Sequence, residues 1–278
     1  MTVKHWMMDL RSIAPRVHCI TNYVTAGDVA NAVLAVGGSP IMAQGHWEVE
    51  DVTSICRSLV LNTGTMEERT PEAMILAGKK AMELGHPIVL DPVGITASSF
   101  RRNAILRILK EVSPSLIRGN ESEIRALNQA LSGLEPGNTC GVDSALKGTE
   151  EGRKQEVQAL AVRTGAVAVM TGAEDMVGDG DHVYRIFNGH PLMSRITGCG
   201  CMMDGVLGAV CGAFPGRGQE LCEIIAHAVA AYGLCGELAG EKTLSMQGGT
   251  GSFRMYFMDF LSMLEDGMLE RGEKIEVS

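Results

Sequence analysis

The segment with the clearest chemical potential is a glycine-rich turn at residues 197–201, Thr-Gly-Cys-Gly-Cys, which opens the apolar stretch 202–210. Such a turn presents unpaired backbone N–H groups at the positive end of a helix dipole, which suits an anion such as a phosphate. Cys201 falls in the first helical turn, where the pKa of a thiol tends to fall and a thiolate can act as a base or nucleophile. A tight turn that only packs a helix through small residues is the competing interpretation.

The cysteines of this turn have a second possible use, as metal ligands. One residue separates Cys199 from Cys201, whereas structural zinc sites separate their cysteines by two or more residues and add a second pair, so the spacing disfavours a metal pair. The chain contains no C-x-x-C pair. We therefore expect reduced, mostly buried thiols and a cytoplasmic protein. The remaining cysteines are Cys19, Cys56, Cys140, Cys211, Cys222 and Cys235.

A second group of polar residues ends short apolar runs that are typical of buried strands. Asp91 ends one run, Arg118 a second and Thr171 a third. The carboxyl ends of strands line the ligand crevice of open α/β sheets, so a carboxylate there suits a metal-bound phosphate. A guanidinium and a hydroxyl at neighbouring strand ends could contact a nucleotide. Asp91 is followed by Pro92, and Asp-Pro is also an ordinary turn, so both interpretations stay open.

Glu123 lies just beyond the run that ends at Arg118. Asn120 followed three residues later by Glu123 is a capping-box pattern, which explains both residues by helix capping alone. The functional alternative is that Glu123 reaches Mg²⁺ through water at the carboxyl end of its strand.

The elements that must position these residues follow from the hydrophobic pattern. Continuous apolar runs alternate with longer amphipathic segments, which predicts buried parallel strands, helices on both faces and a doubly wound α/β fold. Residues 176–188 contain an Asp-Gly turn between apolar residues and predict an antiparallel hairpin at one edge. From residue 198 onward we expect helices to the end, including 219–238 and 253–270. The predicted parallel strands are 58–62, 87–91, 115–118 and 166–171.

Composition excludes several classes of protein. A chain of 278 residues that is 45% hydrophobic can bury a core, and it contains no repeat or linker that divides it. The net charge of -9 argues against nucleic acid or an anionic membrane as a partner, because such binding depends on clustered Lys and Arg. The longest apolar stretch, 224–236, is too short to cross a bilayer, and the N-terminus lacks the apolar core of a signal peptide.

Taken together, these segments resemble the hydroxyethylthiazole kinase family of the ribokinase-like group. The resemblance rests on the order and spacing of several motifs rather than on any one of them. It implies a single ribokinase-like kinase domain over residues 1–278, with a doubly wound, mainly parallel sheet and an antiparallel edge. The matching segments are Val-His-Cys-Ile-Thr-Asn at 17–22, 37–43, Asn-Thr-Gly-Thr at 62–65, 90–93, Ile-Arg-Gly-Asn-Glu-Ser-Glu-Ile at 117–124, Thr-Gly at 171–172, 197–201 and 249–253.

The resemblance implies phosphorylation of the hydroxyl of 4-methyl-5-(2-hydroxyethyl)thiazole by MgATP, in a homotrimer with active sites at subunit interfaces. The residues carried over by motif divide by role. Met42, Gly198 and Asn22 would contact the thiazole, Arg118 and Thr171 would contact ATP, and Asp91 and Glu123 would organise Mg²⁺ through water.

Cys201 stands where sugar kinases of the wider group carry an aspartate base in Gly-x-Gly-Asp. The amides of Gly198, Cys199, Gly200 and Cys201 would form an anion hole for the transferring phosphoryl group. Because phosphoryl transfer asks mainly for alignment and charge neutralisation, a weak base can suffice.

Two departures from the family pattern affect this expectation. Cys199 stands where the family usually has threonine, and the loop 44–48 carries a tryptophan where relatives are usually acidic. Two alternatives stay open. One is another ribokinase-like ATP-dependent enzyme, such as a hydroxymethylpyrimidine kinase or a repair dehydratase, against which Cys201 argues. The other is a thiazole- or nucleotide-binding module that has lost its chemistry.

Overall fold

The computed structural model describes residues 5–133 and 148–277. This part of the chain contains one nine-stranded sheet in the order β2-β1-β3-β4-β5-β6-β7-β8-β9. The strands from β2 to β6 are parallel neighbours, and β7, β8 and β9 continue the sheet in antiparallel fashion. The strands are β1 (Arg16–Ile20), β2 (Ser39–Met42), β3 (Ser58–Asn62), β4 (Ile88–Asp91), β5 (Leu116–Asn120), β6 (Val167–Thr171), β7 (Asp175–Gly178), β8 (Val183–Ile186) and β9 (Ile275–Val277).

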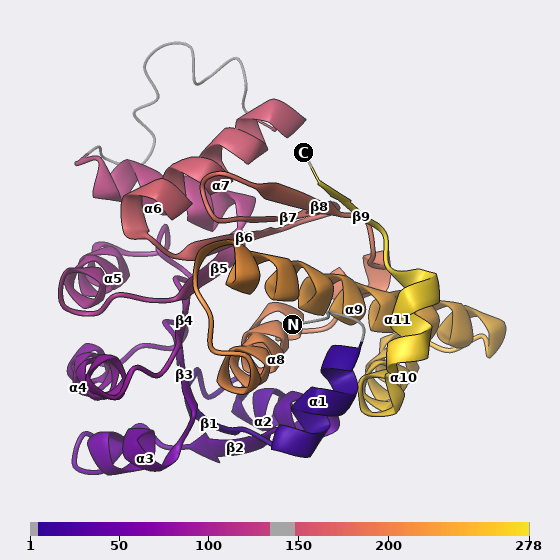
Figure 1. Cartoon of the computed structure of the whole chain (residues 1–278), viewed down its shortest axis with the longest axis horizontal. Coiled ribbons are helices and arrows are strands. Elements are labelled where there is room, and N and C mark those ends of the chain that lie inside the picture. The colour runs from indigo at the N-terminus through magenta and orange to yellow at the C-terminus, as the bar shows by residue number, and fades with distance from the viewer. Residues whose placement is uncertain (1–4, 134–147, 278) are drawn as a thin grey trace.

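Helices cover both faces of the sheet, as Figure 1 shows, with α3, α4 and α5 stacked on one face and α1, α2, α8, α9 and α10 on the other. The doubly wound α/β fold is therefore confirmed. The helices are α1 (Trp6–Ile13), α2 (Ala26–Ala35), α3 (Val49–Ile55), α4 (Thr70–Leu84), α5 (Ser99–Glu111), α6 (Glu121–Leu131), α7 (Glu150–Thr164), α8 (Cys199–Ala213), α9 (Gly218–Ser245), α10 (Thr250–Met263) and α11 (Asp266–Gly272), with a 3-10 helix at Pro191–Arg195.

Two hydrophobic cores form, one on each face of the sheet. Neighbouring residues of a strand point to opposite faces, so Val60 joins the core beneath α8 and Leu61 joins the core beneath α4. Both faces of the central strands are thus apolar. This explains why the four strands predicted from continuous apolar runs correspond to β3, β4, β5 and β6, and the predicted hairpin is β7 and β8.

Two expectations for the C-terminal part were wrong. The helix expected over 253–270 is divided, because Leu264 takes an extended conformation and buries its side chain in the core before α11 begins at Asp266. The chain also returns to the sheet instead of ending in a helix. Ile275–Val277 forms β9, which pairs with β8 and supplies hydrogen-bonding partners to that edge.

The long apolar segment near residue 224 belongs to α9, which extends over 28 residues and has a mean hydropathy of 1.4 in its most apolar window. By length and composition α9 could cross a membrane. The expectation that this part of the chain is too short was therefore wrong, because the helix extends beyond the apolar stretch 224–236 at both ends. In the fold, however, 78% of that window is buried, and α9 packs against β7, β8 and α10. Its burial identifies α9 as a core helix.

Helix α8 lies close to the sheet because glycine faces it. A Cβ atom added at Gly208 would lie 2.4 Å from Cγ2 of Val60 and 3.0 Å from Cγ1 of Val17. These are strand residues of β3 and β1, buried on all sides. A glycine at this position therefore fixes how near α8 approaches the sheet.

The strand order reverses between β1 and β3. After β1 the chain moves outward to β2, then crosses back to β3 and continues to β6. In open α/β sheets ligands bind at the carboxyl ends of the strands beside such a reversal. Asn62 ends β3 and pairs in register with Asp91, which ends β4, so two polar residues meet at this end of the sheet.

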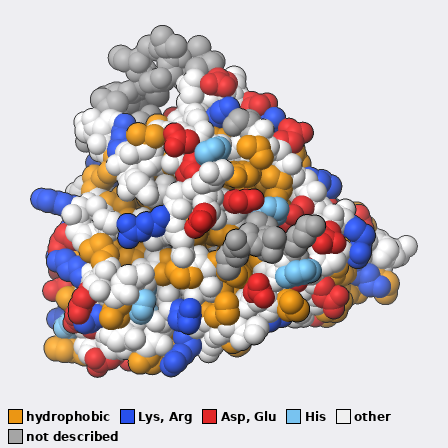
Figure 2. All heavy atoms as spheres, in the orientation of Figure 1, with side chains coloured by type: hydrophobic (Ala, Val, Ile, Leu, Met, Phe, Trp, Pro, Cys, Tyr) orange, Lys and Arg blue, Asp and Glu red, His pale blue; other side chains and the backbone are white. Residues whose placement is uncertain are grey.

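Charged side chains are interspersed on the face of the molecule shown in Figure 2, where red acidic and blue basic groups alternate with apolar and neutral ones. Ion pairs at the surface include Lys79 with Glu111 and Lys80 with Glu83. Pairs of this kind contribute little to stability.

His18 on β1 gives a pH-dependent contribution to stability. Its ring is fully buried, Nε2 lies 2.8 Å from the Ala43 carbonyl oxygen to which it donates, and Nδ1 lies 2.9 Å from Thr53 Oγ1. Burial lowers the pKa of His18 below its usual 6.5. As the pH falls, His18 is therefore protonated in the unfolded chain at a higher pH than in the folded protein. The stability that neutral His18 contributes is present above about pH 6.5 and is lost below it.

We expect the wild-type protein to lose about 1 kcal/mol more unfolding free energy than His18→Gln between pH 6.5 and pH 5.5, since one proton contributes at most about 1.4 kcal/mol per pH unit. Denaturant unfolding at the two pH values measures the difference. Equal losses in both proteins would contradict the assignment to His18.

Candidate functional site

A buried polar cluster lies at the carboxyl ends of β3, β4 and β5, against the first turns of α8. Its members are almost inaccessible to solvent, apart from the half-buried cysteine. Burial of several ionisable groups requires that they pair with one another. The members of the cluster are Asn62, Asp91, Arg118, Cys201 and Asp204.

Asp91 lies at the centre of the cluster. Its Oδ2 accepts hydrogen bonds from Nδ2 of Asn62 at 2.6 Å and from Nη1 of Arg118 at 3.1 Å. Its Oδ1 is buried and has no hydrogen-bond partner among the described residues. The turn interpretation of the Asp-Pro sequence is thus insufficient, because the carboxylate points into the cluster with one oxygen left over.

Asp204 joins the cluster from α8, three residues after Cys201. It is 1% exposed, its Oδ2 accepts a hydrogen bond from Nδ2 of Asn62 at 3.1 Å, and its Oδ1 lies 3.6 Å from Nε of Arg118. Burial raises the pKa of Asp204 well above its usual range, and the charge of Asp91 raises it further. Asp204 and Asn62 were missed as site residues by sequence reasoning.

Arg118 supplies the positive charge of the cluster. Burial alone would lower the pKa of this guanidinium, but Asp204, Asp91 and Glu123 outweigh that effect and raise it. Arg118 therefore stays charged, and its two closest acids hold it in place from β4 and α8.

Cys201 faces the same cluster. Its Sγ accepts hydrogen bonds from Nδ2 of Asn22 at 3.3 Å and from Nδ2 of Asn62 at 3.4 Å. Oδ1 of Asn22 in turn accepts from the backbone and the hydroxyl of Thr25, at 3.1 and 3.0 Å, which fixes the amide orientation. Two side-chain amides thus converge on one sulfur from the strand ends on either side of the reversal.

The glycine-rich turn meets this cluster at the amino end of α8. Gly198 precedes the helix with φ of +80°, a left-handed conformation that favours glycine, and an added Cβ would lie 2.5 Å from Cγ2 of Thr25. An added Cβ at Gly200 would lie against the Arg118 guanidinium. Backbone amides and a guanidinium therefore share one small region, which suits an anion.

Glu123 is held by backbone groups. Its Oε2 accepts from the Asn120 N–H at 2.9 Å and its Oε1 from the Gly94 N–H at 3.2 Å, and Asn120 completes the predicted capping box. Burial, followed by the charge of Asp91, raises the pKa of Glu123. Helix capping thus accounts for its position, beside Asp91.

A cavity of about 510 Å³ opens beside the cluster. Four predicted residues line it, Arg118, Thr171, Cys199 and Gly200. The lining also includes the buried Asp175, whose pKa burial raises to about 7. The cavity is large enough for a small-molecule ligand.

Met42 lies at the edge of the sheet. It ends the edge strand β2, is 39% exposed, and does not line the 510 Å³ cavity. The loop that follows it contains Trp47, which is 84% exposed. These apolar side chains face solvent in the single chain.

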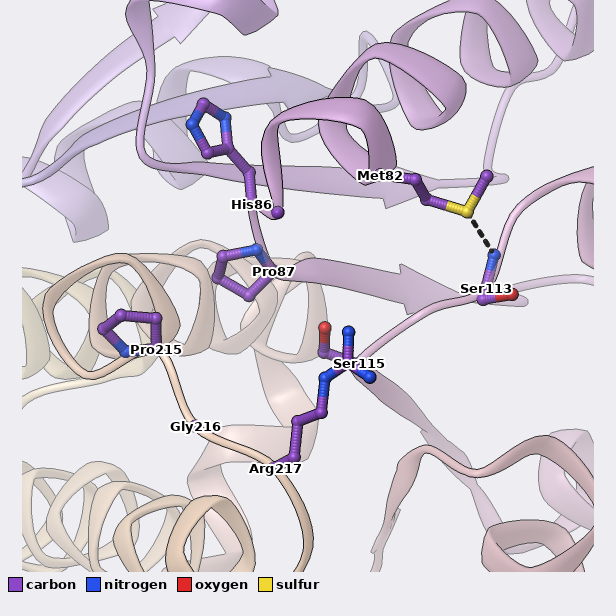
Figure 3. A pocket seen from close by; sticks show the side chains of 9 residues that line it. Met82, His86, Pro87, Ser113, Ser115, Pro215, Gly216 and Arg217 are labelled. Carbon is purple, nitrogen blue, oxygen red and sulfur yellow. Dashed lines mark hydrogen bonds between the residues drawn. The ribbon is translucent and has the colours of Figure 1, made fainter.

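A second cavity, of about 500 Å³, lies at the opposite ends of the strands, where Pro87 and Ser115 precede β4 and β5 (Figure 3). Met82 and Arg217 also line it, and the Ser113 N–H donates to the Met82 sulfur at 3.2 Å. None of the predicted site residues is among the described residues that line it. The two cavities have nearly the same volume, so the predicted site residues in its lining distinguish the cavity at the carboxyl ends.

The cysteines agree with the expectation of unpaired thiols. Five of the described cysteines are buried, and Cys199 and Cys201 are half-buried; all seven are free. Cys140 lies outside the described residues. Burial raises the pKa of Cys199 to about 11, so this thiol stays protonated near neutral pH.

The chemistry supported by this geometry is binding of an anion next to an alcohol or water. Amides at a helix start and a charged arginine would receive the anion, and buried carboxylates offer oxygen ligands for a hard cation. The Cys201 sulfur, which accepts hydrogen bonds from Asn22 and Asn62, faces the same place.

The comparisons with known proteins agree over the whole length. The model of the hydroxyethylthiazole kinase family matches residues 7–267. A protein of Alkaliphilus oremlandii named hydroxyethylthiazole kinase is 45% identical over 270 residues, which are 97% of this chain and 96% of the relative. The structure of a hydroxyethylthiazole kinase protein from Pyrococcus horikoshii OT3 has a TM-score of 0.85 at 30% identity and covers 99% of this chain and 98% of that one.

A ribokinase-like superfamily protein from Enterococcus faecalis V583, at 11% identity, shares the fold with a TM-score of 0.59 over 91% of this chain and 89% of that one. The predicted resemblance and fold class are therefore confirmed. The chain belongs to the hydroxyethylthiazole kinase family and is a phosphotransferase with a ribokinase-like fold.

Proposed function

We propose that residues 1–278 act as one kinase domain that transfers the γ-phosphoryl group of ATP to the hydroxyl of 4-methyl-5-(2-hydroxyethyl)thiazole, in thiamine salvage. The observation that carries this proposal is the meeting of Asp91, Arg118 and Cys201 at the amino end of α8, beside a cavity of about 510 Å³. In-line phosphoryl transfer needs a positioned acceptor, neutralised phosphate charge and a group that takes the hydroxyl proton. Free cysteines support a reducing compartment, the cytoplasm.

ATP occupies the 510 Å³ cavity in this proposal. Arg118 and Thr171 contact the nucleotide, and both line the cavity. The amides of residues 198–201 receive the transferring phosphoryl group, because helix-start N–H groups stabilise negative charge without reorganising. If the backbone alone receives it, cysteine in place of threonine at position 199 is compatible with catalysis.

The residues present fit a magnesium ion. Asp91 has a buried oxygen without a hydrogen-bond partner among the described residues, and Glu123 lies near enough that the charge of Asp91 raises the pKa of Glu123. Carboxylate oxygens are the ligands that Mg²⁺ prefers. In the proposal Asp91 and Glu123 would hold the ion through water, and a bound ion would supply positive charge for the phosphates.

The thiazole lies toward Asn22, Gly198 and Met42, at an interface between copies of the chain in a homotrimer. Two observations support an interface there: Met42 is 39% exposed, and the nearby Tyr23 and Trp47 are 76% and 84% exposed. Exposed apolar side chains of this size are typical of protein contacts. A stable monomer in a solution mass measurement would contradict the interface.

The function is tested by ADP formation with hydroxyethylthiazole, hydroxymethylpyrimidine and ribose as separate acceptors. We expect hydroxyethylthiazole to give the highest kcat/KM. Absence of thiazole-dependent ADP formation would refute the proposal, and preference for the pyrimidine would favour the alternative kinase.

Cys201→Ala is expected to lower kcat about tenfold while KM for the thiazole changes less than about twofold, because a base assists phosphoryl transfer only modestly. Steady-state kinetics measures both constants. Cys211→Ala is the matched control, since Cys211 is a buried thiol of the same helix outside the site. An unchanged kcat for Cys201→Ala would remove Cys201 from the mechanism.

The companion variant Cys201→Asp should retain activity. It restores the base of the related sugar kinases, and the Asn22 and Asn62 amides that now donate to the sulfur can donate to a carboxylate. Activity below that of Cys201→Ala would contradict the assignment of a base to this position.

A further inference from the structure

Asp204 is the one charged member of the buried cluster to which the proposed reaction gives no role. It is the only charged residue between Met202 and Ala213, a stretch of α8 that is otherwise apolar. A carboxylate buried in an apolar helix costs free energy unless a partner compensates it. Its contacts to Asn62 and Arg118 are therefore the place to look for its purpose.

The three nitrogens of the Arg118 guanidinium are in different surroundings. Nη1 donates to Asp91 at 3.1 Å, and Nε lies 3.6 Å from Oδ1 of Asp204. Nη2 lies over Gly200, where an added Cβ would overlap it, and it has no acceptor among the described residues. Gly200 and Arg118 both line the 510 Å³ cavity. Nη1 is thus hydrogen-bonded within the protein. Nε is paired with Asp204 by charge alone, because 3.6 Å exceeds hydrogen-bond distance and Nε has no hydrogen-bond partner among the described residues. Nη2 is available at the cavity wall.

Asn62 connects the two acids that anchor the guanidinium. Its Nδ2 donates to Asp91 at 2.6 Å and to Asp204 at 3.1 Å, and its Oδ1 accepts from the Asn22 amide and the Gly64 N–H, both at 3.0 Å. The carboxylates therefore have a fixed relative position. A planar guanidinium held at two nitrogens by fixed acids has little remaining freedom.

We propose that Asp204 is a positioning residue that holds Nε of Arg118, so that Nη2 is directed at a phosphate oxygen of the bound nucleotide. The inference deepens the proposed function and rests on it for the identity of the ligand as a nucleoside phosphate. Without Asp204 the side chain of Arg118 would still be paired with Asp91 but could rotate about that contact. Nucleotide binding would then include the cost of ordering the guanidinium.

A purely structural role for Asp204 predicts that its replacement lowers the melting temperature, whereas a positioning role does not. Asp204→Asn keeps the shape of the side chain and removes its capacity to carry a negative charge, while Arg118 keeps Asp91 and Glu123 as partners. No buried charge is left uncompensated, so we expect the melting temperature to stay the same or rise. A residue retained for stability would lower it when replaced.

The test is calorimetric binding of ADP to the full-length protein, with excess Mg²⁺ and separately with EDTA. We expect Asp204→Asn to weaken ADP about tenfold in both buffers, while KM for the thiazole changes less than about twofold. A loss seen only with Mg²⁺ would make Asp204 a metal ligand instead and overturn the proposal. Unchanged ADP affinity would overturn it as well.

A double-mutant cycle identifies the residue through which Asp204 acts. In an Arg118→Gln background, Asp204→Asn should have almost no further effect on ADP affinity, because the group that it positions is gone. An equal loss in both backgrounds would refute the proposal. Ser58→Ala is the matched control: the buried Ser58 hydroxyl donates to the Gly208 carbonyl of α8 at 2.7 Å, away from the cluster, so ADP affinity should not change.

Failure of this inference can be distinguished from failure of the proposed function. If the ADP affinities of the variants agree with the expected double-mutant cycle but hydroxyethylthiazole is not phosphorylated, the acceptor was assigned wrongly and the role of Asp204 stands. If the thiazole is phosphorylated and the cycle fails, only the role of Asp204 is lost. Absence of ADP binding by the wild-type protein in either buffer would refute the inference.

Discussion

Asp91→Asn is expected to lower kcat for thiazole phosphorylation about a hundredfold, which corresponds to about 2.7 kcal/mol of transition-state stabilisation. The carboxylate makes two contacts within the protein and keeps one buried oxygen for a further partner. The amide has no negative charge for a divalent cation, and it leaves Arg118 with one acid fewer. We also expect the Mg²⁺ concentration for half-maximal activity to rise.

The measurement is steady-state kinetics across a Mg²⁺ titration, with unfolding curves to verify that the variant folds. Asp266→Asn is a suitable control, because Asp266 begins α11 outside the site. Its carboxylate accepts a hydrogen bond from the Met7 N–H at 3.0 Å. The kcat of this variant should match that of the wild-type protein. An Asp91→Asn variant with wild-type kcat and Mg²⁺ dependence would exclude Asp91 from metal binding.

Gly208→Ala is expected to destabilise the protein by about 2 kcal/mol, and valine at the same position by more, because extra atoms in a packed core force backbone shifts. The added methyl group would lie 2.4 Å from Val60 Cγ2, and a β-branched side chain in a buried strand cannot turn away. Since α8 must move outward, the turn before Cys201 moves with it. We therefore expect kcat to fall together with stability.

Chemical denaturation gives the free energy of unfolding, and Gly27→Ala is the matched control. Gly27 is also helical, in α2, but an added Cβ meets nothing within 4 Å. Alanine there should stabilise the helix by up to about 1 kcal/mol. If both substitutions had the same effect, close approach of α8 to the sheet would not be the reason for glycine at position 208.

Much of the fold could be predicted from the sequence because its strands carry apolar residues on both faces. The run Ser58–Asn62 became β3 with the bounds expected for it. The C-terminal errors have a common physical cause. Leu264 ends α10 to fill the core, and Ile275–Val277 forms a strand because β8 offers it backbone partners. Both depend on contacts with residues distant in sequence, which local periodicity does not contain.

The site was partly predictable for a similar reason. Asp91 and Arg118 end apolar runs, and parallel strands bring such ends together, so their proximity follows from the fold class. Asp204 is a turn further along α8 and ends no strand. The sequence could have indicated Asp204 in one way, because it is the single acidic residue of an otherwise apolar helix. The role assigned to Met42 came from family resemblance alone, whereas the strand-end positions of Thr171 and Glu123 allowed their roles and the resemblance favoured them. All three roles stay predictions.

The glycine-mediated contact between α8 and the sheet also bears on how the site responds to heat. Helix α8 packs on β1, β3 and β4 and on α2, in the interior of one of the two cores. Segments with that much burial open only when the whole domain opens, unlike surface lids, which open alone. The phosphate-facing turn is the direct extension of this helix. Loss of activity on warming should therefore coincide with global unfolding, and no separate, earlier inactivation step should precede it.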